Sequence, residues 1–151
     1  MEGYPRGGCS SQGDDRTRQL EEARGGWVKA DADGALSKVN GTGGGGAILR
    51  DNHGEFLVGC CHFFPSTHDA EVAGLMACRR ALPLANELYV QRIILEIDSQ
   101  VVARNLINEE KDFSANGQLV EEIKVLLESF PDFRVALVRR SANNVAHVLA
   151  K

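Results

Sequence analysis

Three acidic residues in this sequence stand where predicted strands end or where a predicted helix begins. Asp33 lies at the end of an alternating apolar segment, Glu71 in the first turn of a helical segment, and Asp98 at the end of a second apolar segment. None of them has a basic residue beside it in the sequence. Hard oxygen ligands suit Mg²⁺ or Mn²⁺ and not zinc. The three carboxylates together therefore predict a site for divalent cations.

Each acid also has a local structural interpretation. Asp33 beside Gly34 is typical of a turn, Glu71 favours the positive end of a helix, and Asp98 can cap the helix that follows it. Glu71, however, begins a helical stripe of otherwise apolar residues that should face the sheet, and an inward carboxylate needs a partner such as a cation. Three acids at the ends of successive core elements favour a shared cation.

Hydrophobic periodicity predicts the elements that must position these acids. In chain order they are strands over residues 27–35, 47–50 and 55–64, a helix over 67–87, a strand over 91–98, helices over 99–108 and 116–130, a strand over 133–139 and a helix over 143–151. Ser66 or Thr67 is expected to cap the first helix. Residues 40–46 are expected to form a glycine-rich turn.

The predicted order is therefore βββαβααβα. Three strands joined by short turns and two strands joined through helices predict an α/β fold with a mixed five-stranded sheet and helices on its faces. The last predicted helix stops after about two turns, so we expect it to be truncated.

Composition predicts one globular domain and a tail. The chain has 151 residues, of which 43% are hydrophobic and 25% charged. Residues 1–26 combine Gly, Ser, Arg and acids with few apolar residues, which predicts a disordered tail or linker before a domain over 27–151. No apolar run approaches the length of a membrane span. We expect an intracellular monomer, in nucleus or cytoplasm, with no membrane association and no inferable protein partner.

The formal net charge of −4 argues against a simple electrostatic binder of nucleic acid. A phosphate-binding site in such a domain needs local positive charge. Bound metal ions can supply that charge.

Four groups of residues resemble motifs of the type 1 ribonuclease H family. They are Asp33-Gly34-Ala35, Ala70-Glu71 with Ala73 and Ala81, Glu96-Ile97-Asp98-Ser99, and the segment from Asn143 through His147 to Ala150. The similarity covers residues 27–151 and is closest to the plant reverse-transcriptase-like branch, which often derives from retroelements. It implies the ribonuclease H fold and hydrolysis of the RNA strand of RNA–DNA hybrids.

The resemblance also implies roles for the acids. Asp33 would bridge two Mg²⁺ or Mn²⁺ ions, and Glu71 and Asp98 would complete the metal shell. One ion would activate the attacking water while the other stabilises the leaving oxygen.

Contacts with nucleic acid are implied for a further set of residues. Recognition is expected to rest on backbone and 2′-hydroxyl contacts and not on base reading. The expected residues are Gly34, Ala35, Gly43, Ser99, Arg139, Arg140 and Asn143.

The chain departs from the family pattern in three places. His147 stands where catalytic members usually have a fourth acid, and it is either a ligand acting with Asn143 or a helix histidine with no catalytic task. The loop before the last helix is shortened to residues 139–142, where Arg139 and Arg140 contact phosphate or are merely solvated. The connection over residues 108–117 is too short for a basic helical handle, which should weaken binding to hybrids.

Two functions follow from these features. The first is a metal-dependent endonuclease acting on RNA–DNA hybrids. The alternative is a non-catalytic nucleic-acid-binding or scaffold module that retains the fold of a retroelement-derived nuclease. The three retained acids favour the first, whereas His147, the short loop and the acidic balance favour the second.

Overall fold

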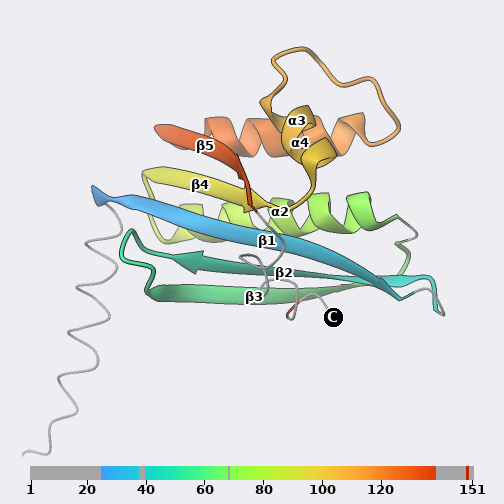
Figure 1. Cartoon of the computed structure of the whole chain (residues 1–151), viewed down its shortest axis with the longest axis horizontal. Helices are drawn as coiled ribbons and strands as arrows, with labels where there is room; N and C mark the ends of the chain where they lie inside the picture. The colour runs from blue at the N-terminus through green and yellow to red at the C-terminus, as the bar shows by residue number, and fades with distance from the viewer. Residues whose placement is uncertain (1–24, 38–39, 68, 139–148, 150–151) are drawn as a thin grey trace, which may run out of the picture.

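A computed structural model describes residues 25–37, 40–67, 69–138 and 149 of the chain. Its single described sheet has five strands in the order β3-β2-β1-β4-β5 (Figure 1). The elements are β1 (Trp27–Ser37), β2 (Thr42–Arg50), β3 (Phe56–Phe64), α2 (Ala70–Glu87), β4 (Arg92–Ile97), α3 (Gln100–Ile107), α4 (Gly117–Glu128) and β5 (Asp132–Leu137).

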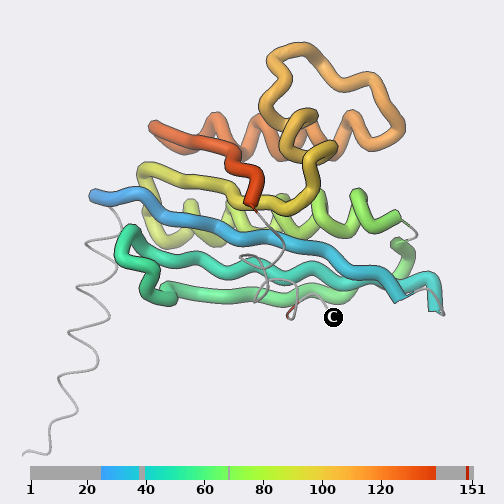
Figure 2. Tube along the Cα trace, in the orientation of Figure 1, coloured from blue at the N-terminus to red at the C-terminus, as the bar shows by residue number. Residues whose placement is uncertain are grey.

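The predicted α/β fold with a mixed sheet is confirmed. β1, β2 and β3 pair antiparallel, whereas β4 pairs parallel with β1 and β5 parallel with β4. Figure 2 shows the chain passing from the three antiparallel strands into the strands that are linked through helices. Most of the predicted tail and of the last predicted helix lies outside the described residues. None of the helices in the described ranges is long and apolar enough to cross a membrane.

The core lies between the sheet and α2, which packs across β1 and β2, and it continues into the buried sides of α3 and α4. The stripe of α2 that Glu71 begins is buried at Leu75, Cys78 and Leu82, and the small residues Ala73, Ala77 and Ala81 beside it are buried as well. They pack on the alternate β1 residues Val28, Ala30 and Ala32, which are also buried. Small side chains on both elements allow the helix to approach the strand closely.

The predicted glycine-rich turn over residues 40–46 is wrong for most of its length. Only Asn40 and Gly41 form the turn, and the glycines from Gly43 to Gly46 belong to β2. Their backbones pair with β1 and β3 on both sides. A Cβ on Gly45 would lie 2.9 Å from the Phe64 ring and 3.0 Å from the Ala77 Cβ. Gly45 therefore makes room for Ala77 of α2 and for the Phe64 ring.

The predicted caps of the first helix are also corrected. α2 begins at Ala70, and its N-cap is Asp69 instead of Ser66 or Thr67. The Asp69 carboxylate accepts a hydrogen bond from the Glu71 N–H at 2.9 Å. Asp69 can cap the helix because its backbone is extended, with φ −127° and ψ 126°.

The tightest helix–strand contact lies at Gly34 of β1. A Cβ at this position would overlap the backbone of Ala73 and Gly74 in the first turns of α2. Backbone atoms cannot move aside as the end of a flexible side chain can. The contact therefore needs glycine and fixes where the amino end of α2 lies on the sheet.

We predict opposite effects for two glycine-to-alanine changes at this contact. Gly34→Ala should lower the free energy of unfolding by about 1–3 kcal/mol or more, because the helix must shift away from β1. Gly74→Ala should raise it by up to ~1 kcal/mol, since an added Cβ has open space among the described residues and alanine favours the helix. Urea denaturation of both variants measures the difference. Equal effects would contradict the close contact.

Candidate metal centre

Asp33, Glu71 and Asp98 line one pocket of about 320 Å³. Its walls come from β1, from the first turns of α2, and from the junction between β4 and α3. The remaining lining residues are small or apolar apart from Ser99, and they are Ala32, Gly34, Ala70, Gly74, Ile97 and Val102. The fold thus brings three acids far apart in the sequence to one pocket.

The sheet register and the Gly34 contact account for this placement. β1 pairs parallel with β4 so that Asp31 lies opposite Glu96, and two residues further on each strand come Asp33 and Asp98. Asp33 lies within β1 just beyond the part that pairs with β4, and Asp98 directly follows β4, so the prediction that Asp33 ends its strand is wrong. Neighbouring strands lie about 5 Å apart, which brings the two acids to the same pocket. The backbone of α2 rests on Gly34, and this brings Glu71 to the pocket as well.

The immediate surroundings of the acids are polar at the backbone. Asp33 is only 8% exposed, and its Oδ1 accepts a hydrogen bond from the Gly34 N–H at 2.9 Å. Asp98 does not cap α3, because Ser99 is the N-cap and accepts from the Val102 N–H at 3.3 Å. The capping interpretation of Asp98 is therefore wrong.

The donor set fits a hard divalent cation in its chemistry. The carboxylates of the pocket supply oxygen ligands, which Mg²⁺ and Mn²⁺ prefer. Burial raises the pKa of the nearby Cys78 thiol to about 12, and the charge of Asp33 acts in the same direction, so Cys78 stays a neutral thiol. Within the described ranges no three acidic, histidine or cysteine side chains converge closely enough to hold an ion as they stand. A bound ion would have to draw the carboxylates inward.

The other predicted site residues divide into three groups. Gly34 and Ser99 line the pocket of the three acids. Ala35 and Gly43 line a separate pocket of about 750 Å³ that also involves Phe63 and Leu149. The predictions for Arg139, Arg140, Asn143 and His147 fall outside the described residues.

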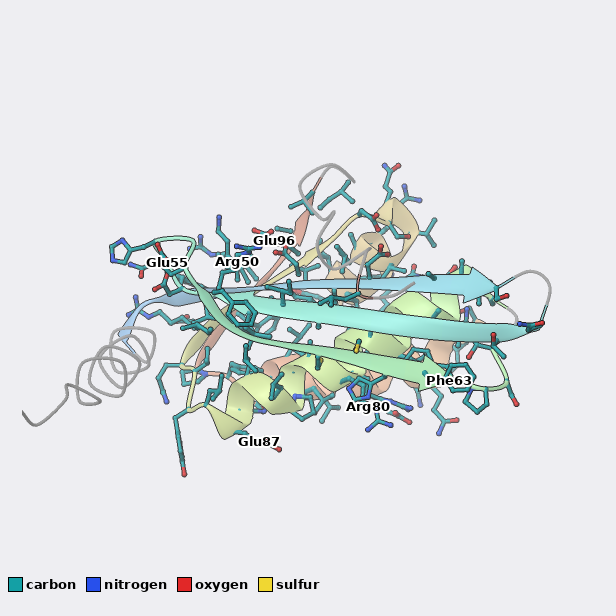
Figure 3. All side chains as sticks on the ribbon, turned by 90° about the horizontal axis from the view of Figure 1, so that it is seen from below. Arg50, Glu55, Phe63, Arg80, Glu87 and Glu96 are labelled. Carbon is teal, nitrogen blue, oxygen red and sulfur yellow. The ribbon has the colours of Figure 1, made fainter. Side chains whose placement is uncertain are left out.

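A second pair of acids, Asp31 and Glu96, was not predicted as functional. They face each other across β1 and β4, and Figure 3 shows Glu96 and Arg50 on the side of the sheet away from α2. Arg50 Nε lies 4.0 Å from Asp31 Oδ2, and Lys29 Nζ lies 3.7 Å from Glu96 Oε1. The alternation of Lys29 and Asp31 with apolar residues was the only sequence signal for this pair.

Asp31 is held in an unfavourable setting for a charged carboxylate. Its buried Oδ1 receives no hydrogen bond from any residue that the structure describes. Burial, followed by the neighbouring Glu96 carboxyl, raises the pKa of Asp31 from 3.8 to about 7, despite the opposing charges of Arg50 and Lys29. Two carboxyl groups can share a hydrogen bond only while one of them holds a proton.

This raised pKa predicts a pH-dependent gain in stability for Asp31→Asn. The folded state keeps the proton up to about pH 7, whereas the unfolded chain loses it near pH 4, so the wild type loses stability as pH rises between these values. The stabilisation by Asn should therefore grow from pH 5 to pH 8 by on the order of 2 kcal/mol. Denaturation curves across this range measure it, and a gain that is the same at every pH would contradict the assignment.

Known proteins share this fold. The α/β architecture and the order of the five strands are those of the ribonuclease H-like fold. The family described as "Reverse transcriptase-like" matches residues 31–151. The chain therefore belongs to the reverse transcriptase-like family. None of the curated proteins searched matches the chain.

Solved structures show the same fold. The RNase H1 of the halophilic archaeon Halobacterium salinarum has a TM-score of 0.76 and 25% identity, over 83% of this chain and 95% of that one. The N-terminal RNase H domain of Mycobacterium tuberculosis rv2228c has a TM-score of 0.76 and 21% identity, over 83% and 91%. LC11-RNase H1 in complex with an RNA/DNA hybrid has a TM-score of 0.70 and 20% identity, over 82% and 93%.

Proposed function

We propose that this protein is a metal-dependent endonuclease that hydrolyses the RNA strand of RNA–DNA hybrids. The observation that carries the proposal is the shared pocket of Asp33, Glu71 and Asp98. Membership of the reverse transcriptase-like family and the fold shared with an RNase H1 that binds an RNA/DNA hybrid support it.

The three acids would have distinct tasks. Asp33, Glu71 and Asp98, which line one pocket, would hold Mg²⁺ or Mn²⁺ ions, with Asp33 of the central strand as the shared ligand. When bound, such ions supply Lewis acidity for an attacking water and for the leaving oxygen. The Gly34 N–H holds one Asp33 oxygen in place by a hydrogen bond, and the carboxylate stays available as a metal ligand.

Binding of the hybrid would rest on backbone and sugar contacts near the pocket. Gly34 and Ser99 line it, and the small residues Ala35 and Gly43 open onto the neighbouring pocket. Small side chains allow a nucleic-acid backbone to approach the protein main chain. Arg139, Arg140 and Asn143 are proposed as phosphate contacts from the sequence alone.

Cleavage of a labelled RNA–DNA hybrid in Mg²⁺ or Mn²⁺ tests the proposal. Asp33→Asn should lower the rate by on the order of a hundredfold or more, because even outer-shell partners of metal ligands are worth about 10–100-fold. Asp132→Asn is the matched control, since Asp132 is an exposed residue at the start of β5 that pairs with Arg92 on the surface. Cleavage that persists in Asp33→Asn would assign it to a contaminant or to another site.

We further predict that His147→Asp raises the cleavage rate. The change supplies the fourth carboxylate that catalytic members usually carry, and a carboxylate suits Mg²⁺ better than imidazole does. Single-turnover cleavage at several Mg²⁺ concentrations measures the gain. A lower rate in the variant would instead show that His147 itself takes part.

A second candidate function is a non-catalytic nucleic-acid-binding or scaffold module. Two observations favour it, namely the absence of a compact three-acid cluster among the described residues and the net charge of −4. This function predicts that wild type and Asp33→Asn bind a hybrid equally and that neither cleaves it in Mg²⁺ or Mn²⁺.

A further inference from the structure

Asn116 occupies the N-cap of α4, but its side chain does not cap the helix. An asparagine at this position normally accepts a hydrogen bond from the backbone of the first turn. In the described structure Asn116 makes no such side-chain bond. Its Nδ2 instead donates to Glu71 Oε1 at 3.4 Å, across 45 residues of sequence. The amide thus serves a carboxylate of the candidate metal centre.

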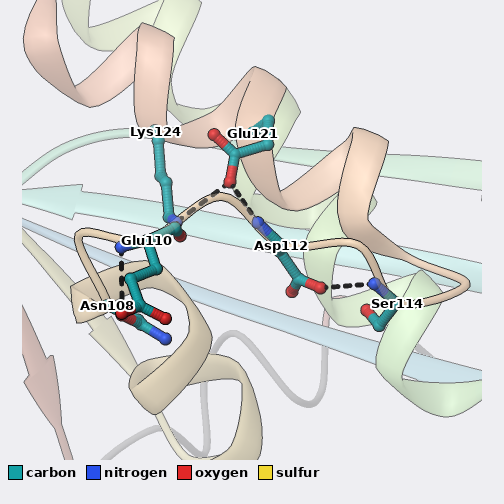
Figure 4. A network of polar contacts seen from close by, with 6 residues as sticks. All are labelled: Asn108, Glu110, Asp112, Ser114, Glu121 and Lys124. Carbon is teal, nitrogen blue, oxygen red and sulfur yellow. Dashed lines mark hydrogen bonds and ion pairs between the residues drawn. The ribbon is translucent and has the colours of Figure 1, made fainter.

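The loop before α4 is fastened to that helix, which fixes where its last residue lies. The Asp112 N–H donates to Glu121 Oε1 at 2.9 Å, and the Ser114 N–H donates to Asp112 Oδ1 at 2.8 Å (Figure 4). Lys124 Nζ donates to the Glu110 carbonyl and to Glu121 Oε1, both at 3.0 Å. The short connection over residues 108–117 is therefore held against α4, and it fixes the position of Asn116.

Side-chain hydrogen bonds join α2 and α4 at three positions along their length. The three side-chain links are Glu71 with Asn116, Arg79 with Glu122 at 2.9 Å, and Asn86 with Ser129 at 2.9 Å. Residue numbers rise together along both helices, so α2 and α4 lie side by side in a parallel register. The first of these links lies at the pocket of the three acids.

We propose that Asn116 is a positioning residue that holds the Glu71 carboxylate for metal binding, an inference that rests on the proposed function. A neutral amide donor occupies one oxygen of Glu71 and leaves the other available as a ligand. Because the amide carries no charge, it does not compete with a cation as a lysine or arginine would. Outer-shell contacts of this kind orient metal ligands and commonly contribute about 10–100-fold to metal affinity or activity.

Mn²⁺ titration of the full chain without nucleic acid tests this inference. Asn116→Ser keeps a residue suited to helix capping but is too short to reach Glu71, so the thermal midpoint should hold or rise slightly. Its Mn²⁺ dissociation constant should increase by about tenfold. Asn86→Ser is the matched control, because it also removes an interhelical amide bond but lies away from the pocket. That variant should keep the wild-type Mn²⁺ affinity.

A double-mutant cycle separates positioning from a general structural effect. In a Glu71→Gln background, Asn116→Ser should cause no further loss of Mn²⁺ affinity, since its effect acts through Glu71. An unchanged Mn²⁺ affinity in Asn116→Ser would overturn the inference. So would a raised KM for the hybrid with unchanged Mn²⁺ affinity, which would make Asn116 a substrate contact. A wild type that binds no Mn²⁺ would instead overturn the proposed function itself and this inference with it.

Discussion

The close contact between α2 and β1 at Gly34 is the constraint on which the rest of the structure depends. A side chain at Gly34 would overlap the helix backbone, so only glycine allows α2 to rest directly on the central strand. The small residues of α2 and Gly45 of β2, which lies against Ala77, extend the same close approach along the helix. Because Glu71 lies in the first turn of this helix, the contact also brings a carboxylate to the pocket beside Asp33.

Concentrating acids on two adjacent strands has an electrostatic cost that the structure meets in different ways. Asp33 receives a backbone N–H, whereas Asp31 faces Glu96 and is relieved by a raised pKa and by Arg50 and Lys29. Buried carboxylates need such compensation because a low-dielectric setting disfavours their charge. Asp33, Glu71 and Asp98 differ in that they open onto a pocket, where a cation can reach them.

The short, acidic connection between α3 and α4 holds Asn116 in place beside Glu71. The Asp112 carboxylate in this connection accepts from the Ser114 N–H, while Glu121 of α4 accepts from the Asp112 N–H and from Lys124, and these bonds hold the loop against α4. The loop ends at Asn116, which donates to Glu71. Acidic residues next to this loop can thus fix the position of Asn116 and, through it, of the Glu71 carboxylate.

Local patterns in the sequence determined the order of strands and helices and the three acids Asp33, Glu71 and Asp98, because hydrophobic periodicity and element ends depend on neighbouring residues. Tertiary structure decided what those patterns could not express. The local sequence predicted a turn at glycines 43–46, but pairing with the strands on both sides makes them extended, and Gly45 also lies against α2. Asp69 and Ser99 became caps through backbone conformation. The bond from Asn116 to Glu71 joins residues 45 positions apart, and only the packing of α4 on α2 brings them together.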